Sequence, residues 1–158
     1  MLRPVVVAVD GSDACVRALV WAFRYAAPLG LPVVALTTWP LHGETCGAPR
    51  RHTVLDPRWL AREVQAEAVA RALAAVEEVP SYHLEVDNAE LVDALIKAGE
   101  RASMVVIGCD GPEDTNPARV HLVDRVRHEV HAPVTVVGPD GPLPAPAHEQ
   151  DRQHGPGR

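Results

Sequence analysis

Residues 4–12 read PVVVAVDGS, and this short stretch decides the fold class. The run from Pro4 to Val9 is apolar throughout and rich in valine, whose β-branched side chain favours strands. A strand that is apolar on both faces is typical of a parallel sheet covered by helices on both sides. In the turn that follows, either Ser12 or Asp13 is suited to cap a helix. The segment therefore predicts the first strand and the first helix start of an α/β domain.

Further strands and helices alternate along the chain. Three more short apolar runs predict strands, over residues 31–38, 104–108 and 133–137, and the alternating segment over residues 81–86 predicts a further strand. Helical spacing of apolar residues predicts four helices: from residue 13 to Gly30, over residues 58–79, from a capping box formed by Asp87 and Glu90, and from Asn116-Pro117. This order predicts an α/β fold, a five-stranded parallel doubly wound sheet with helices on both faces.

The chain has room for one domain, because 158 residues support a single core. We predict a domain over residues 1–138. Residues 139–158 (PDGPLPAPAHEQDRQHGPGR) are dense in proline and glycine and predict a disordered tail.

Composition excludes several classes of protein. The formal net charge of −6 argues against a nucleic-acid partner, which requires a basic surface. No apolar run approaches the roughly 18 residues of a membrane helix, and the N-terminal run is too short for a signal peptide. The three cysteines are odd in number and widely spaced, which fits a reducing compartment. We therefore expect a cytoplasmic protein.

Two loops are candidates for a ligand site. Ligands of open α/β sheets bind beyond the carboxyl ends of strands, where the strand order reverses. Asp10-Gly11-Ser12 follows the first strand, and its carboxylate can accept from a ribose hydroxyl. Gly108-Cys109-Asp110-Gly111 follows the fourth, and its glycines can let backbone N–H groups approach a phosphate. Ordinary turn chemistry explains Asp-Gly-Ser equally well.

The chain resembles the universal stress proteins in several segments: VVVAVDGSD after residue 4, VVALTTW at residues 33–39, MVVIGCDG at 104–111 and HAPVTVV at 131–137. The resemblance covers residues 3–138 and implies the adenine nucleotide alpha hydrolase-like fold. In that family, nucleotide-binding members have Gly, two residues, Gly, nine residues, then Gly and Ser or Thr after the fourth strand. Here Gly108 and Gly111 supply the first half, but His121 and Leu122 stand at the closing pair. The motif is therefore degenerate.

This departure predicts poor binding of a triphosphate. A helix that starts at Asn116 would place His121 and Leu122 inside it, with their N–H groups spent on helical bonds. Asp110, Glu113 and Asp114 add negative charge, and like charges 4 Å apart repel by roughly 4 kcal/mol at an effective dielectric of 20.

The resemblance also implies roles for single residues. Asp10 corresponds to the family's ribose- or adenine-side carboxylate, and Thr38 lies where the family's backbone meets the adenine. The base half of a nucleotide could therefore fit even where its phosphate half does not. A protonated His121 could pair with a phosphate, although a polar position on an amphipathic helix is the simpler interpretation. The tentative nucleotide-binding residues are Asp10, Gly11, Ser12, Thr38, Gly108, Gly111 and His121.

Other side chains give weaker signals. His42, Cys46 and His52 share a loop, but their spacing matches no common zinc pattern, and no metal site is predicted. Cys109 has no identifiable partner base and is expected to be a small buried residue. The sequence contains no Ser-His-Asp nucleophile elbow and no Walker A lysine, so no catalytic residue is assigned.

Two functional hypotheses remain open. The first is a stress-response module without enzymatic activity, with weak or absent ATP binding, that acts as a homodimer and engages an unknown protein partner. The resemblance implies a dimer through the last strand, at Val134, Val136 and Val137, and a valine-rich edge strand needs such cover. The second is a sensor that binds ATP or AMP; an ATP-hydrolysing enzyme is a more distant third.

Overall fold

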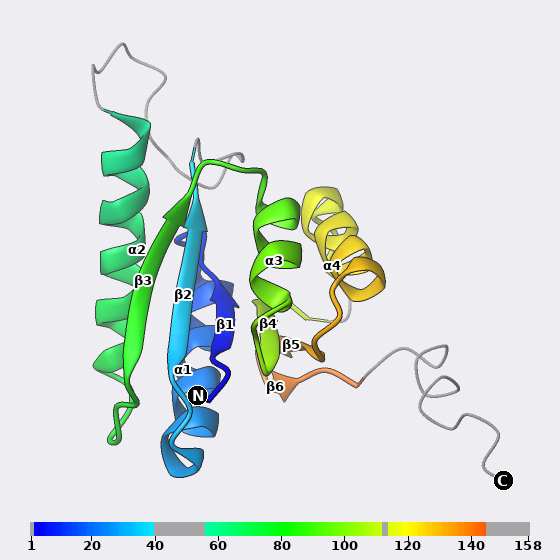
Figure 1. Ribbon diagram of the computed structural model, residues 1–158. Helices are drawn as coiled ribbons and strands as arrows, with labels where there is room; N and C mark the ends of the chain where they lie inside the picture. Colours follow the sequence, from blue (N-terminus) through cyan, green and yellow to red (C-terminus); the bar gives the residue numbers. More distant parts are fainter. Residues whose placement is uncertain (1, 40–55, 112–113, 145–158) are drawn as a thin grey trace, which may run out of the picture.

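A computed structural model describes residues 2–39, 56–111 and 114–144. Its sheet has the strand order β3-β2-β1-β4-β5-β6 (Figure 1). The strands are β1 (Val5–Ala8), β2 (Val33–Thr38), β3 (Tyr82–Asp87), β4 (Met104–Gly108), β5 (Val134–Gly138) and β6 (Gly141–Pro142). The helices are α1 (Asp13–Leu29), α2 (Pro57–Leu73), α3 (Leu91–Gly99) and α4 (Pro117–Glu129).

The predicted α/β fold is confirmed. The first five strands pair in parallel, and each begins and ends within two residues of its predicted bounds. A sixth strand was not predicted: β6 folds back antiparallel on β5. β6 lies beyond residue 138, in the segment for which we predicted disorder. Residues 145–158 of that segment lie outside the described residues, so the domain boundary stays a prediction.

Two apolar layers cover the sheet, as the alternation of strand side chains requires. One face carries Val5, Val7 and Val9 against Leu19 and Phe23 of α1, with alanines of α2 beside them. The opposite face carries the intervening strand residues against α3 and α4, including Leu95 and Val126. Each strand of the centre is therefore buried on both sides, which explains its unbroken apolar sequence.

Two of the helix predictions were wrong in detail. The second helix ends at Leu73 and not at residue 79, because the chain must turn before β3, and Arg24 of α1 donates to the freed carbonyl of Ala75 at 3.1 Å. Asp87 does not form a capping box, since it is the last residue of β3 and its carboxylate accepts from the N–H of Ala89 at 3.0 Å. Glu90 is the N-cap residue of α3, without a side-chain hydrogen bond.

Glycine has a steric role at the end of β4. A Cβ on Gly108 would lie 2.1 Å from the carbonyl oxygen of Ala14 in the first turn of α1. Only glycine lets the strand and the helix backbone come this close. The contact brings the start of α1 directly against the end of β4, beside the position where the strand order reverses.

Candidate functional site

The strand order reverses between β1 and β4, and the two loops singled out in the sequence meet there. β1 pairs with β2 on one side and with β4 on the other, so the loops after β1 and β4 emerge side by side at the carboxyl edge of the sheet. This is the position at which open α/β sheets bind their ligands.

The first loop is held by hydrogen bonds between near neighbours. Asp10 accepts from the N–H of Ser12 at 2.9 Å and from the Ser12 hydroxyl. Ser12 is the N-cap residue of α1, and its Oγ accepts from the N–H of Cys15 at 3.2 Å. Gly11 has φ = 88°, a conformation that suits glycine. The Asp10 carboxylate is therefore already hydrogen-bonded within its own turn.

The second loop contains an ion-pair cluster of two arginines and two aspartates. Arg119 of α4 donates to Asp110 at 2.8 Å and to Asp114 at 3.0 Å, and only 9% of its side chain is exposed. Arg17 of α1 donates to Asp110 at 3.1 Å and to the carbonyl of Cys109 at 3.1 Å. The two guanidinium charges balance the two carboxylates. The negative charge that we expected to repel a phosphate is therefore neutralised at these two aspartates; Glu113 lies outside the described residues.

Asp114 occupies an anion position within this cluster. Its carboxylate accepts from the backbone N–H of Asp110 at 3.1 Å and from that of Asn116 at 3.0 Å, in addition to Arg119. Asn116 caps α4, so the carboxylate lies at the N-terminus of that helix, where anions are favoured. The arrangement of two amides, a helix N-terminus and a guanidinium is one that would hold a phosphate. In this chain it holds Asp114.

The ionisation of these groups follows from their surroundings. Burial alone would raise the pKa of the Asp114 carboxyl, but the N–H groups of Asn116 and Asp110 and the Arg119 guanidinium outweigh burial and hold the pKa below its usual value of 3.8. Burial opposes the charge of Arg119, yet both aspartates raise the pKa of its guanidinium. Asp114 and Arg119 are therefore both charged at neutral pH.

The space left between the two loops is small. The hollow there has a volume of about 20 Å³, close to the room that one water needs. Its walls include Asp10, Ser12, Gly108, Arg119 and Leu122. Larger hollows of about 710 Å³ and 640 Å³ lie elsewhere, between α3 and strands β1 to β3 and between α2 and β3. The hollow at the strand reversal is therefore the smallest of these three.

The structure brings together only part of the predicted site. Asp10, Ser12 and Gly108 line the hollow, and Gly11 belongs to the same turn. Gly111, with φ = 126°, is buried in the second loop but does not line the hollow. Thr38 is 7% exposed at the end of β2, and it too is absent from the walls. Whether these residues bind a nucleotide stays a prediction.

The prediction for the closing pair of the motif is confirmed in its structural part. His121 and Leu122 lie inside α4, as expected from the start of this helix at Asn116. His121 is exposed and does not line the hollow, whereas Leu122 does. The N–H groups at these positions belong to the helix, so they are not free to bind a phosphate.

Sequence reasoning missed Arg119 and Arg17. Arg119 is the single basic residue of the acidic segment 110–119. Its presence there could have indicated that it pairs with the carboxylates of this segment. Arg17 gave no signal, because it reaches Asp110 from a position 93 residues earlier in the chain.

The other candidate groups do not form a site in the described residues. Cys109 is buried, as expected, and burial raises the pKa of the neighbouring Cys15 thiol to about 11, so Cys15 is protonated at neutral pH. Within residues 2–39, 56–111 and 114–144, no three His, Cys, Asp or Glu side chains gather as metal ligands. His42, Cys46 and His52 lie outside the described residues. No helix of the described part of the chain is long and apolar enough to cross a membrane.

Comparisons with known proteins place this geometry in context. A model of the Universal stress protein family matches residues 1–138. A universal stress protein solved in complex with cAMP is 20% identical, with a TM-score of 0.64 over 87% of this chain and 98% of its own. The universal stress protein from Archaeoglobus fulgidus is 27% identical, with a TM-score of 0.59 over 86% of this chain and 98% of its own. A second structure of that protein, in complex with dAMP, is 26% identical, with a TM-score of 0.58 over 85% and 96%. The search of curated proteins found no match.

Proposed function

The chain belongs to the universal stress protein family, and from this premise we propose that it is a non-enzymatic regulatory module whose phosphate position is filled by its own Asp114. In this proposal the protein does not bind ATP in the manner of the family's nucleotide-binding members. It acts in a stress response through its surface and through a protein partner. No catalytic residue is part of the proposal.

The observation that carries this proposal is the set of bonds to the Asp114 carboxylate. This group accepts from the N–H of Asp110, the N–H of Asn116 and the guanidinium of Arg119. A phosphate that entered the loop would have to displace the Asp114 carboxylate. Because this carboxylate is covalently part of the chain, it binds these donors without losing translational freedom, whereas a free phosphate would lose it. Such an internal anion is therefore a strong competitor for the same donors.

The small volume of the hollow supports the same conclusion. About 20 Å³ is far below the 300 Å³ or more that ligand pockets typically have. Arg119 and Leu122 of α4 occupy the wall at which a nucleotide's phosphates would have to enter. Opening the site would require breaking the ion pairs of Arg119 as well as moving Leu122.

An adenine mononucleotide is the second candidate. The relative from Archaeoglobus fulgidus, 26% identical to this chain, was solved in complex with dAMP. Asp10 and Thr38, which the family resemblance assigns to the base and ribose, are both present and partly or fully buried at strand ends. A ligand with one phosphate needs fewer hydrogen-bond donors from the second loop than ATP does. An AMP sensor is therefore the alternative that the base half of the site favours.

Calorimetric titration of the full chain with Mg-ATP and with AMP tests both candidates. We expect no saturable heat with ATP up to about 1 mM, a limit that corresponds to a binding free energy weaker than about −4 kcal/mol. Saturation by micromolar ATP would refute the proposal. Saturation by micromolar AMP, without ATP binding, would establish the second candidate.

A variant decides whether Asp114 is the obstacle. Asp114→Ala releases two amides and one of the two carboxylate bonds of Arg119, so it should raise the affinity for phosphate-bearing nucleotides about 10-fold or more. Asp124→Ala, an exposed aspartate of α4, removes the same charge elsewhere on the same helix and should leave affinity unchanged. If both variants, or neither, gain affinity while remaining folded, the competitor role of Asp114 is wrong.

The family's expected dimer contact needs revision in one respect. We expected β5 to present a free edge at Val134, Val136 and Val137, but β6 pairs with it at Val137 and Gly138, and the N–H of Leu143 donates to the carbonyl of Val136 at 2.8 Å. A homodimer through the last strand would therefore have to use the remaining part of that edge, near Val134, or displace β6.

A further inference from the structure

The two faces of the sheet are covered unequally by helices. On one face, α2 packs against β2 and β3, and α1 packs against β1, β4 and β5. On the other face, α3 packs against β1, β2 and β4, and α4 packs against β5. In Figure 1, which looks onto this second face, no helix of the described residues lies in front of β2 and β3. The second face of β3 is therefore the part of the sheet that the described helices leave most open.

The largest of the three hollows, of about 710 Å³, lies on this open part of the sheet. Its floor includes Val6 of β1 with Val34 and Leu36 of β2, which are at most 7% exposed. One wall is α3, where Ala94 and Ala98 lie one turn apart and present only small side chains. The opposite wall is β3. The hollow therefore follows β2, between a helix on one side and an edge strand on the other.

The amino end of the hollow is apolar and open to solvent. Leu2 is 62% exposed there, and Pro4 and Pro32 are half-buried beside it. A single exposed leucine is ordinary, but this one adjoins a hollow with an apolar floor. An occupant of the hollow would remove Leu2 and both prolines from water, which favours binding.

The β3 wall of the hollow is acidic. Glu85 lies next to Leu36 in the sheet, and Asp87 lies next to Thr38, so both carboxylates project from the face that carries the floor. Neither takes part in an ion pair among the described residues. Asp87 accepts from the N–H of Ala89 at 3.0 Å. These two carboxylates are therefore available to a cationic group in the hollow.

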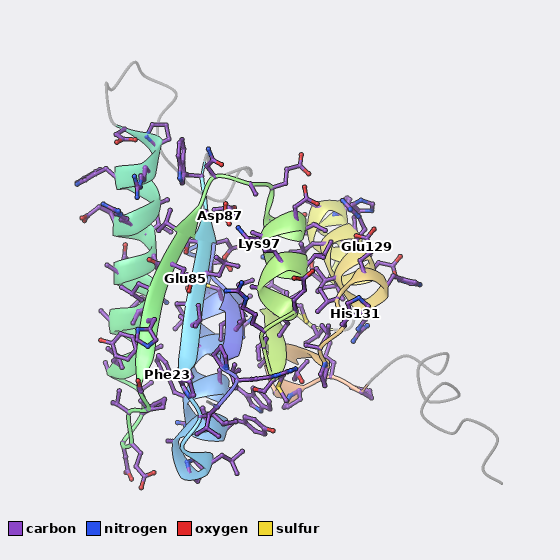
Figure 2. All side chains as sticks on the ribbon, in the orientation of Figure 1. Phe23, Glu85, Asp87, Lys97, Glu129 and His131 are labelled. Atoms are coloured by element: carbon purple, nitrogen blue, oxygen red, sulfur yellow. The ribbon has the colours of Figure 1, made fainter. Side chains whose placement is uncertain are left out.

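The α3 wall and the amino end of the hollow are mainly basic. Lys97 and Arg101, one turn apart on α3, line the hollow, and Arg3 lines its amino end together with His83 and Glu100. Figure 2 shows Lys97 on the side of α3 next to the sheet, with the labelled carboxylates of β3 opposite. The three basic side chains take part in no ion pair among the described residues. The hollow thus has an acidic wall and a basic wall on either side of an apolar floor.

An occupant of this hollow has to satisfy its own backbone groups. β2 is paired on both sides, with β1 and β3, so it offers no free N–H or C=O to a molecule that lies on its face. A helix forms its backbone bonds internally, and its diameter of about 10 Å covers two strands that are about 4.8 Å apart. The six residues of β2 extend about 20 Å, which is the length of a helix of about 13 residues.

The charges also give such a helix a direction. Asp87 ends β3, at the carboxyl end of the sheet, whereas Arg3 precedes β1, at the amino end. The partly positive N-terminus of a helix is favoured next to Asp87, and its partly negative C-terminus next to Arg3. This direction is opposite to that of the strands, and it is the direction in which crossover helices run between parallel strands.

We propose that an amphipathic helix of a partner protein docks in this hollow. Its apolar stripe lies on the floor, its basic side chains lie along the β3 wall, and its acidic side chains lie along the α3 wall. The apolar contacts supply affinity, and the charges set the direction and exclude helices with another pattern. This inference rests on the proposed function, in which the chain acts through a protein partner, and it identifies the surface and the kind of partner.

Binding of two labelled peptides to the full chain, measured by fluorescence anisotropy, tests the proposal. Each peptide has about 14 residues with a leucine and alanine stripe, and a covalent link between outward side chains holds it helical. The first has lysines along the β3 edge and glutamates along the α3 edge; the second has them exchanged. We expect the first to bind with a Kd of about 100 μM or below and the second about 10-fold more weakly. Equal affinities, or no saturation by the first below about 1 mM, would overturn the proposal.

Charge reversals in the walls test the direction of the helix. Lys97→Glu and Glu85→Lys should each weaken binding of the first peptide about 5-fold or more, because each places like charges together. The two changes combined should make the chain prefer the second peptide. Glu67→Lys is the matched control, since Glu67 is exposed on α2, which covers the other face, and it should change neither affinity. A double variant that still prefers the first peptide would refute the assignment of the walls.

Other occupants would give different results, and each would overturn the proposal. Binding of the dye anilinonaphthalene sulfonate that Leu2→Ser and Lys97→Glu both abolish, without binding of the first peptide, would assign the hollow to a small apolar anion. Self-association in sedimentation that Lys97→Glu abolishes would assign it to a second copy of the chain.

The peptide experiment is separate from the test of the proposed function. None of the groups that bond the Asp114 carboxylate, on Asp110, Asn116 and Arg119, lines this hollow. A chain that binds neither the peptides nor ATP would refute the docking of a helix and leave the proposed function standing. Micromolar binding of ATP would refute the proposed function whatever the peptides do.

Discussion

The two loops at the strand reversal are held in different ways. The loop after β1 is shaped by bonds between residues two and three apart, from Asp10 to Ser12 and from Ser12 to Cys15. The loop after β4 is fixed by Arg17, 93 residues away from Asp110, and by Arg119 of the following helix. The first loop could keep its form in any chain with Asp-Gly-Ser. The second depends on which side chains the fold brings near it.

This difference explains where the chain departs from the nucleotide-binding pattern. A loop held by its own backbone can leave its remaining amides free for a phosphate, as in other glycine-rich turns. The second loop instead uses its amides and both arginines on two aspartates, Asp110 and Asp114. In the proposed function, this filled loop leaves no vacancy for a ligand. Changes at each loop can therefore test whether local or distant contacts hold it.

The largest effect is expected from Gly108→Ala. Its Cβ would lie 2.1 Å from the carbonyl oxygen and 2.4 Å from the carbonyl carbon of Ala14, and these backbone atoms cannot move without shifting α1. We expect the free energy of unfolding to fall by about 3 kcal/mol or more, measured by urea denaturation.

Gly11→Ala is the matched change in the first loop. Its Cβ would meet the Cγ1 atom of Val64 at 2.6 Å, which is a side-chain atom that can rotate, although the φ of 88° adds strain of about 1–2 kcal/mol. Gly30→Ala, with φ = 65° and open space around it, isolates the strain. If Gly108→Ala costs no more than Gly30→Ala, the close contact between β4 and α1 is not as the structure describes it.

The next largest effect is expected at the ion-pair cluster. Arg119→Met leaves Asp114, whose side chain is also only 9% exposed, without its charged partner, and we expect a loss of about 2 kcal/mol in the free energy of unfolding. A double-mutant cycle with Asp114→Asn should show a coupling energy of about 1 kcal/mol or more.

Arg125→Met provides the control for this cycle. Arg125 pairs with Glu129 at 2.9 Å on the surface of the same helix, and such exposed pairs contribute about 0.3–0.5 kcal/mol. Equal losses for Arg119→Met and Arg125→Met would show that the second loop does not depend on its arginine, and the contrast between the two loops would fail.

A smaller effect is expected from Ser12→Ala in the first loop. The change removes the N-cap bond to Cys15 and the hydroxyl bond to Asp10, and loss of such a cap costs about 1 kcal/mol. Ser12→Thr keeps a hydroxyl and should recover most of this stability in thermal or urea unfolding. If Ser12→Ala were as costly as Arg119→Met, the first loop would carry more than its local bonds explain.

The same contrast shows what the sequence could predict. Apolar runs predicted four of the five parallel strands, and alternation predicted the fifth, over residues 81–86. The caps at Ser12 and Asn116 were predictable because a cap involves residues two or three apart. The position of His121 and Leu122 inside a helix, where their N–H groups form helical hydrogen bonds, followed from the cap at Asn116. Such features depend on interactions between residues that are close in the sequence, so they can be predicted from it directly.

Features that depend on distant parts of the chain were not predictable. The bond from Arg17 to Asp110 joins positions 93 residues apart, and the role of Gly108 depends on the carbonyl of Ala14. β6 was missed because a strand of two residues gives no periodic signal. The acidic residues of the second loop were recognised, but their effect was misjudged, because their partners are set by the fold and not by spacing.

The smallest expected effect is the pH dependence contributed by Asp114. Burial opposes ionisation of this carboxyl, yet the N–H groups of Asn116 and Asp110 and the guanidinium of Arg119 lower its pKa below 3.8. A pKa that is lower in the folded state means that the folded state binds fewer protons, so this stabilisation is present above pH about 4 and is lost as the pH falls through the folded-state pKa. The loss on acidification should therefore be smaller in Asp114→Asn than in the unaltered chain, by less than about 1 kcal/mol between pH 5 and pH 3. Unfolding by urea at both pH values measures the difference. Identical pH dependence in the two proteins would mean that Asp114 is not bonded as an anion in the folded loop, and the proposed lack of a phosphate position would then rest on Leu122 and the helix alone.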